Sequence, residues 1–405
     1  MRLKDIAYIN PAYTGPDLGD QLVSFSPMEC LRYDSLKPIT ISFSEAKGKY
    51  TFFKDNDILF AKVTPCFENQ NIAIANNLVN GIGFGSSEIN VLRLKSDASL
   101  RYMFYVICSN RFYNTGCSSM CGVGGLKRIN PRAVSTFEFT MPSLTEQEAI
   151  AAYLDKECEK IGRKIELLER KAYAYSRLRR SLINRAVTRG LDPNKTFKTS
   201  KSSICTEIPS HWREKRIKDI FTEKSIKGYP NEPMLCATQS KGVIPQSLYE
   251  NRVVTAVSGL ENMKLVDVGN FVISLRSFQG GIEYAYYRGI ISAAYTILEL
   301  DTNNSRDYFR HFFKSLSLIK LMKKCVTGIR DGQNINYTTL KYEHIPVPPI
   351  DEQNEIAAYL DEKCAKIDTI LEKINTEVER LKELKRSLIN EVVTGQRAID
   401  TESRS

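Results

Sequence analysis

Hydrophobic residues recur at alternating spacings of three and four along two stretches of the chain, residues 145–190 and 351–396. The pattern persists for four heptads in each stretch, which is typical of a coiled coil. Each stretch is therefore predicted to be one helix of roughly 45 residues, about 65–70 Å long. The two seams of the first stretch are Leu154, Ile161, Leu168, Tyr175, Leu182 and Ala151, Cys158, Ile165, Ala172, Arg179. Those of the second stretch are Leu360, Ile367, Ile374, Leu381, Leu388 and Ala357, Cys364, Leu371, Val378, Lys385.

Both predicted helices have start and stop signals. Each follows a proline and opens with acidic residues, which suit the positive end of a helix dipole. We expect Thr145 and Asp351 to cap the free backbone N–H groups. Gly190 and Gly395 lie where the helical pattern stops, so they predict the C-terminal ends.

The remaining segments have a mixed pattern. Residues 49–63 and 87–95 alternate and are rich in Phe, Ile and Val, which predicts strands. The following stretch, 100–112, has helical spacing and is expected to pack on the sheet. The second half repeats this order, with strands predicted at 268–277 and 293–301 and a helix at 306–324. The fold class is therefore α+β.

The chain contains an internal repeat with an offset of 206 residues. PSLTEQEAIAAYLDKEC (142–158) matches PPIDEQNEIAAYLDEKC (348–364), and RSLIN recurs at 180–184 and 386–390. A second, weaker repeat with a different offset, RLKDI (2–6) and RIKDI (216–220), precedes these blocks. A repeat of this kind predicts two equivalent structural units. The predicted parts are a globular segment at 1–141, a helical spacer at 142–190, an exposed linker at 191–205, a second globular segment at 206–347, a second spacer at 348–396 and a tail at 397–405.

The two helices carry opposite net charge. Residues 145–190 hold 11 basic and 7 acidic residues, whereas 351–396 hold 7 and 11. We therefore expect the helices to pair with each other as an antiparallel coiled coil, and two separate helices packed on their own domains are the alternative. The net charge of +10 then resides on the globular segments, which favours a polyanionic partner there.

Catalytic motifs are missing. The phosphate-binding pattern GxxxxGK[ST] is absent. Asn10-Pro11-Ala12-Tyr13 lacks the second proline of an adenine methyltransferase motif, and Asp34 with Glu45 is a poor match to a nuclease site. The three histidines share no motif, and no CxxC pair occurs among ten cysteines. We expect no covalent chemistry and no metal or cofactor site in this chain.

The same features indicate the cell compartment. No run of 18 apolar residues is present, and the N-terminus has no apolar core of signal-peptide length. Scattered cysteines are typical of reduced thiols. A cytoplasmic protein without membrane contact is the expectation.

The repeated plan resembles the specificity (S) subunits of type I restriction–modification systems over essentially the whole chain. The resemblance rests on the two EQxxIAxYLD blocks at 146–155 and 352–361, the two SLIN stretches, and the phrase Ile208-Pro209-Ser210-His211-Trp212 before 216–220. The first half departs from the family pattern because it has no counterpart of Trp212.

The resemblance implies a function. Each globular segment would be a target recognition domain that reads one half of a bipartite double-stranded DNA site. The helices would space the two halves and dock two methyltransferase subunits, and restriction–translocase subunits would join. S-adenosylmethionine, ATP and Mg²⁺ would be used by those partners and not by this chain. A structural coiled-coil protein and a self-contained DNA methylase or nuclease are the competing hypotheses.

Base reading requires Arg, Lys, Asn, Gln or Ser on loops that enter a groove, with glycines where backbone approaches phosphate. The candidate DNA-binding residues of the two domains are Lys62, Thr64, Asn69, Gln70, Lys127 and Arg128, and Arg276, Ser277, Gln279, Gly328, Arg330, Gly332, Gln333 and Asn334. The candidates for partner docking are the first motif residues of each helix, Glu146, Gln147, Glu352 and Gln353. Plain helix capping is the alternative role of the two glutamates.

Overall fold

The computed structural model describes residues 1–95, 98–122, 125–249, 259–327 and 334–399. The chain divides into two compact units, unit 1 (Met1–Glu169 with Thr376–Ser405) and unit 2 (Arg170–Asn375). Both long helices pass from one unit to the other, α6 (Leu144–Arg189) and α11 (Ile350–Val393). In the described parts of the chain, no helix is apolar enough over a sufficient length to cross a membrane.

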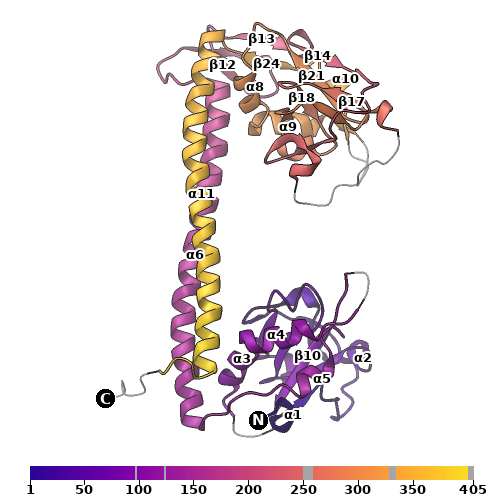
Figure 1. Cartoon of the computed structure of the whole chain (residues 1–405), viewed down its shortest axis with the longest axis vertical. Helices are drawn as coiled ribbons and strands as arrows, with labels where there is room; N and C mark the ends of the chain where they lie inside the picture. The colour runs from indigo at the N-terminus through magenta and orange to yellow at the C-terminus, as the bar shows by residue number, and fades with distance from the viewer. Residues whose placement is uncertain (96–97, 123–124, 250–258, 328–333, 400–405) are drawn as a thin grey trace. The chain divides into compact units, whose positions relative to one another are not determined.

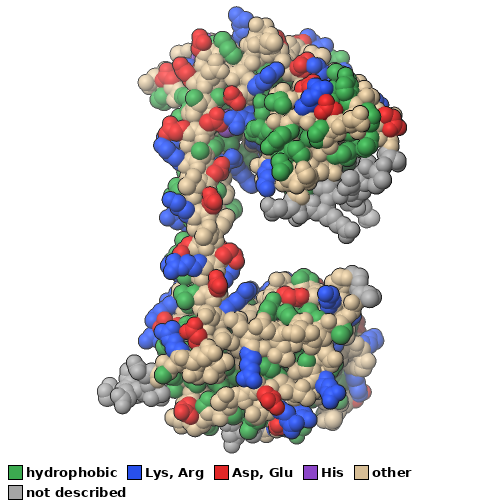
Figure 2. Space-filling view, viewed as in Figure 1, with side chains coloured by type: hydrophobic (Ala, Val, Ile, Leu, Met, Phe, Trp, Pro, Cys, Tyr) green, Lys and Arg blue, Asp and Glu red, His purple; other side chains and the backbone are tan. Residues whose placement is uncertain are grey.

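The long helices pair side by side and antiparallel, as the charge pattern predicted (Figure 1). In unit 1, Lys164 Nζ lies 3.0 Å from Glu377 Oε1, and in unit 2, Arg179 Nε lies 3.0 Å from Asp368 Oδ1. The predicted seam residues are all buried or half-buried. On the face visible in Figure 2, acidic and basic side chains are interspersed along the pair.

The helix ends confirm the predicted stops and correct the predicted starts. Gly190 and Gly395 follow the helices with φ of 74° and 76°. The expected caps Thr145 and Asp351 were wrong, because α6 begins at Leu144 and α11 at Ile350. In unit 1 the cap is Ser143, whose Oγ accepts from Glu146 N at 3.3 Å.

Unit 1 contains two four-stranded sheets. The order of the first is β1-β10-β7-β8, with all pairs antiparallel, and that of the second is β5-β2-β9-β6, with β2 and β9 parallel. The strands are β1 (Ala7–Ile9), β2 (Leu22–Ser26), β5 (Ile39–Ser42), β6 (Thr51–Lys54), β7 (Ile58–Ala61), β8 (Ile72–Ile74), β9 (Ile82–Gly85) and β10 (Ile89–Leu94), with the hairpin β3 (Leu31–Arg32)–β4 (Ser35–Leu36). The helices are α1 (Leu3–Ile6), α2 (Phe43–Ala46), α3 (Leu100–Cys108), α4 (Asn110–Ser118) and α5 (Pro131–Ser135).

Unit 2 repeats this topology. Its four-stranded sheet β14-β21-β18-β19 corresponds to the first sheet of unit 1, and a parallel bridge between Met234 and Ile290 joins the pairs β15–β16 and β17–β20. The strands are β14 (Phe221–Lys224), β15 (Leu235–Thr238), β16 (Gly242–Pro245), β17 (Lys264–Val266), β18 (Phe271–Ile273), β19 (Glu283–Tyr284), β20 (Gly289–Ile291) and β21 (Thr296–Leu300), with the further pairs β11 (Phe197–Thr199)–β12 (Glu207–Pro209), β13 (Arg213–Arg216)–β24 (His344–Val347) and β22 (Val326–Thr327)–β23 (Asn334–Ile335). The helices are α7 (Ser277–Gly280), α8 (Arg306–Phe312), α9 (Leu316–Lys324) and α10 (Tyr337–Leu340).

Each predicted domain helix is in fact a pair of short helices. The break falls at Ser109 in unit 1 and at Ser315 in unit 2, which are equivalent positions of the repeat. Ser109 Oγ accepts from Phe112 N, and Ser315 Oγ accepts from Leu318 N, each at 3.3 Å. A serine at this place caps a new helix and redirects the chain.

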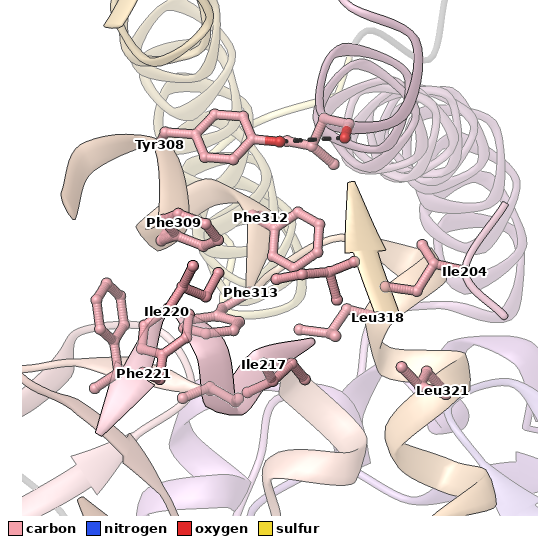
Figure 3. Packing of buried hydrophobic residues seen from close by; sticks show 14 of the residues in the cluster. Ile204, Ile217, Ile220, Phe221, Tyr308, Phe309, Phe312, Phe313, Leu318 and Leu321 are labelled. Carbon is pink, nitrogen blue, oxygen red and sulfur yellow. Dashed lines mark hydrogen bonds between the residues drawn. The ribbon is translucent and has the colours of Figure 1, made fainter. Parts of the chain in front are cut away.

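The core of each unit forms where its helix pair packs on the sheet and on the long helices. In unit 2, Phe309, Phe312 and Phe313 are fully buried, and Tyr308 Oη donates to Val187 O of α6 at 3.3 Å (Figure 3). The predicted exposed linker also joins this core. Its residues 197–199 pair with β12, and Ile204 is buried, because the hairpin folds back onto the helix ends.

Candidate nucleic-acid interface

Two loops of unit 1 come together beyond the end of β7. Thr64 N donates to Lys127 O at 2.9 Å, and Lys127 N donates to Thr64 Oγ1 at 2.9 Å. Ile129 N donates to Lys62 O at 2.9 Å. The structure therefore gathers four predicted residues, Lys62, Thr64, Lys127 and Arg128, at one place on the surface.

Not all of these side chains are available to a ligand. Lys127 and Asn69 are exposed. Arg128 is exposed as well, but its guanidinium holds Glu88 through Nη2–Oε1 at 2.8 Å and Nε–Oε2 at 2.9 Å, which lowers the pKa of Glu88. Thr64 braces the two loops, and Gln70 Nε2 donates to Cys108 O at 3.3 Å. Lys127 and Asn69 thus have the most accessible side chains of this set.

The corresponding loop of unit 2 follows β18 and contains α7. Arg276 and Gln279 are exposed on it. Ser277 is only 1% exposed, and its Oγ accepts from Ser274 N at 2.9 Å. The prediction that Ser277 binds DNA is wrong, because its hydroxyl is buried and holds the turn together.

A half-buried lysine holds this loop in position. Lys314 Nζ donates to Gly280 O at 3.2 Å, to Gln239 O at 3.3 Å and to Glu283 Oε2 at 2.6 Å. Burial raises the pKa of Glu283 to about 7 and lowers that of Lys314, although their attraction opposes both shifts. The ammonium therefore joins the β15–β16 turn, the end of α7 and β19. Sequence reasoning missed this pair because nothing in the sequence places residues 239, 283 and 314 together.

The remaining candidates of unit 2 fall in a second loop. Gly328, Arg330, Gly332 and Gln333 lie outside the described residues. Asn334 begins β23, where it is the register partner of Thr327 in β22.

The glutamines of the repeated motif connect each domain to its long helix. Gln147 Oε1 accepts from Ser99 N, the N-cap of α3, at 2.9 Å, and its Nε2 donates to Pro142 O at 2.8 Å. Gln353 does the same with Ser305 N, the N-cap of α8, at 2.8 Å and with Pro348 O at 2.9 Å. With exposures of 3% and 1%, neither glutamine can dock a partner, so that prediction is wrong for both.

The two motif glutamates have different surroundings. Glu146 is exposed and forms a capping box, since its Oε2 accepts from Ser143 N at 2.9 Å. Glu352 is buried and accepts from Trp212 Nε1 at 3.0 Å, His211 Nε2 at 2.6 Å and Lys195 Nζ at 2.7 Å. Burial acts to raise the pKa of Glu352, but these hydrogen bonds outweigh it and lower the pKa. Glu352 thus anchors the folded linker, which contradicts a docking role for it.

The aspartates that end the YLD motif form a second link. Asp155 Oδ1 accepts from Tyr105 Oη and from Arg101 Nε, each at 2.6 Å. At the equivalent place, Asp361 Oδ1 lies 2.7 Å from Nε2 of the buried His311. Tyr105 and His311 occupy equivalent repeat positions, so the two units make the same contact with different side chains. The repeat itself was the signal that could have revealed these roles.

In the described ranges, no group of three or more His, Cys, Asp or Glu side chains could hold a metal ion. His211 and His311 contact helix carboxylates, and His344 lies in β24. His211 and His311 therefore join their segments of unit 2 to α11.

A profile of the type I restriction modification DNA specificity domain matches residues 4–171 and again 209–380. The chain belongs to this family. Each match covers one globular segment and the first part of the long helix that follows it, which agrees with the repeated topology. Resemblance to S subunits and the α+β plan with an antiparallel helix pair are thereby confirmed.

Individual relatives agree with this assignment. The chain is 37% identical over 158 residues to the EcoEI specificity subunit of Escherichia coli, a match that covers 38% of this chain and 26% of that protein. It is 38% identical over 152 residues to the EcoAI specificity subunit of the same species, covering 36% and 26%. The chain thus matches about a quarter of the length of each relative.

The fold is also similar to a solved structure. A chain from a study of complex assembly and conformational transition of the type I R-M system superposes with a TM-score of 0.72 at 17% identity, covering 98% of this chain and 97% of that one. At this identity the likeness establishes the fold.

Proposed function

We propose that this chain is the DNA sequence-specificity subunit of a type I restriction–modification complex. Each unit reads one half of a bipartite double-stranded target, and α6 and α11 space the two readers. The observation that carries the proposal is the duplication of one topology, with Gln147 and Gln353 fixing each domain to an equivalent helix start. Such a duplication matches a DNA site in two parts.

The two half-sites are expected to differ. The two joined loops of unit 1 present Asn69 and Lys127, whereas the loop after β18 of unit 2 presents Arg276 and Gln279. Each set contains one cation and one amide, so the expected difference rests on the globular segments, which differ in sequence far more than the two helices do and so meet the major groove with different loops. The helices hold the two readers apart, so the bases between the half-sites remain unread.

The chain supplies recognition in this proposal and no chemistry. Two methyltransferase subunits dock on the exposed faces of the helix pair, and restriction–translocase subunits join them. S-adenosylmethionine, ATP and Mg²⁺ belong to those partners. Because Gln147, Gln353 and Glu352 are buried, the proposed docking surface does not include them.

The test is co-purification with the methyltransferase subunit encoded nearby, followed by genome-wide mapping of methylated adenines. A two-part motif with a fixed unread gap is the expected result. Methylation by this chain alone would instead favour a self-contained enzyme. Failure to form a complex, together with no selective DNA binding, would leave a structural coiled-coil protein.

A further inference from the structure

The part of α6 in unit 2 borders an open groove of about 560 Å³. Four arginines of α6 line it, Arg177, Arg180, Arg185 and Arg189, together with Tyr173 of the same helix and Leu316 at the start of α9. All four arginines are exposed. They extend over roughly 18 Å of helix, at 1.5 Å per residue.

These positive charges are poorly compensated. Among the described residues that line the groove there is no carboxylate, and Arg189 reaches Glu207 only at 3.6 Å between two exposed side chains. Arg177 lies over the ring of Tyr173 at 6.0 Å. Like charges on neighbouring helical turns repel each other, so the cluster weakens the isolated helix. A ligand with several negative charges would relieve that repulsion.

The internal repeat shows that the fold does not require these arginines. In unit 1 the equivalent groove is lined by Arg380, Glu383 and Arg386. Arg177 corresponds to Glu383, and Arg185 corresponds to Glu391. The same helix surface therefore tolerates carboxylates, whereas all the described charged residues that line the groove of unit 2 are arginines.

The basic groove lies close to the predicted reading loop of unit 2. Lys314 binds Gly280 O at the end of α7, and Leu316, two residues further along the chain, lines the groove. Two residues span at most about 7 Å. A duplex that contacts Arg276 and Gln279 would thus have its backbone near these arginines.

We propose that this groove binds the phosphate backbone of double-stranded DNA beside the half-site that unit 2 reads. The inference rests on the proposed function. An acidic protein segment is the other polyanion that such a groove fits. The neighbouring loop favours the duplex, because a duplex bound there would bring its phosphates close to the groove. A guanidinium group can bind two phosphate oxygens at once and requires no particular base.

The test uses the assembled complex and the variant R177E/R185E, which copies the residues that the chain itself carries in unit 1. Binding of a target duplex is measured between about 0.05 and about 0.3 M salt. Loss of two phosphate contacts should reduce the slope of log K against log salt by about 1.8, which is about 60-fold in affinity at 0.1 M. The variant should lose affinity by the same factor for the target duplex and for a duplex with one altered half-site. Its selectivity between the two duplexes should therefore equal that of the wild type. R380A, in the equivalent groove of unit 1, is the matched control and should leave the slope unchanged.

Several outcomes would overturn the proposal. An unchanged slope, with selective binding by the wild-type complex, would exclude a phosphate site here. Loss of a partner subunit from the variant, with no change in the DNA slope, would assign the groove to an acidic protein segment. A wild-type complex without sequence selectivity would refute the proposed function, whereas the slope on any duplex would still test the groove. The urea midpoint of the variant, followed by Trp212 fluorescence, checks that unit 2 remains folded.

Discussion

The buried amide of Gln353 distinguishes a structural role of the repeated motif from a docking role. Gln353→Met keeps the size of the side chain and removes its hydrogen bonds to Ser305 N and Pro348 O. Both backbone groups belong to buried residues, and each loses its partner. An unpaired buried group costs about 1–3 kcal/mol, so the loss of two partners should cost unit 2 about 2–6 kcal/mol of stability.

The chain offers a convenient reporter for this measurement. Trp212 is its single tryptophan and is fully buried in unit 2. With a urea dependence of about 2–3 kcal/mol per molar, the midpoint followed by Trp212 fluorescence should fall by about 1–2 M. Asn354→Met, at the exposed neighbour, should leave the midpoint unchanged. Gln147→Met should destabilise unit 1, seen as faster proteolysis, with little effect on the Trp212 transition.

A docking role predicts the opposite pattern. In that case Gln353→Met would leave the urea midpoint of the isolated chain unchanged and would weaken co-purification with the methyltransferase subunit. Such a result would refute the assignment of Gln353 to the junction between α8 and α11.

Three further predictions follow from other contacts. Burial lowers the pKa of His311, so below about pH 6.5 this side chain binds more protons in the unfolded chain than in the folded chain, and its contribution to stability falls as the pH falls. The raised pKa of Glu283, about 7, acts in the opposite direction over the same range. The comparison with His311→Tyr, which copies Tyr105, isolates the His311 contribution: relative to this variant, the wild type should lose at most about 1.4 kcal/mol per pH unit, measured from urea midpoints at about pH 7.5 and about pH 5.5. Lys314→Met leaves Glu283 buried without its partner and should lower the free energy of unfolding, followed by Trp212 fluorescence, by about 3–5 kcal/mol. Adding Glu283→Gln should recover part of that loss. Equal midpoints for the single and double variants would contradict the ion pair. Lys127→Ala and Arg276→Ala should each weaken binding to one half-site only, measured on duplexes with one half altered, and a uniform loss on all duplexes would show phosphate contacts instead.

Local sequence patterns determined the regular parts of this protein. The spacing of apolar residues predicted both long helices, because a helix buries one stripe whatever it packs against. Gly190 and Gly395 predicted their ends, because a positive φ is easily adopted by glycine. The 206-residue offset predicted two equivalent units, and the opposite charges of the helices predicted their pairing. Even the serine at 109 and 315 was a readable signal for a helix break.

The tertiary structure alone decided what the polar residues of the motifs do. Gln147, Gln353 and Glu352 lie at the starts of amphipathic helices, where a polar side chain is normally exposed, and they are buried only because another segment covers them. The partners of Lys314 and Arg128 lie 31 and 40 residues away in the chain, at Glu283 and Glu88. Such pairs form when folding brings distant segments together, and a local sequence pattern does not predict which segments will come into contact.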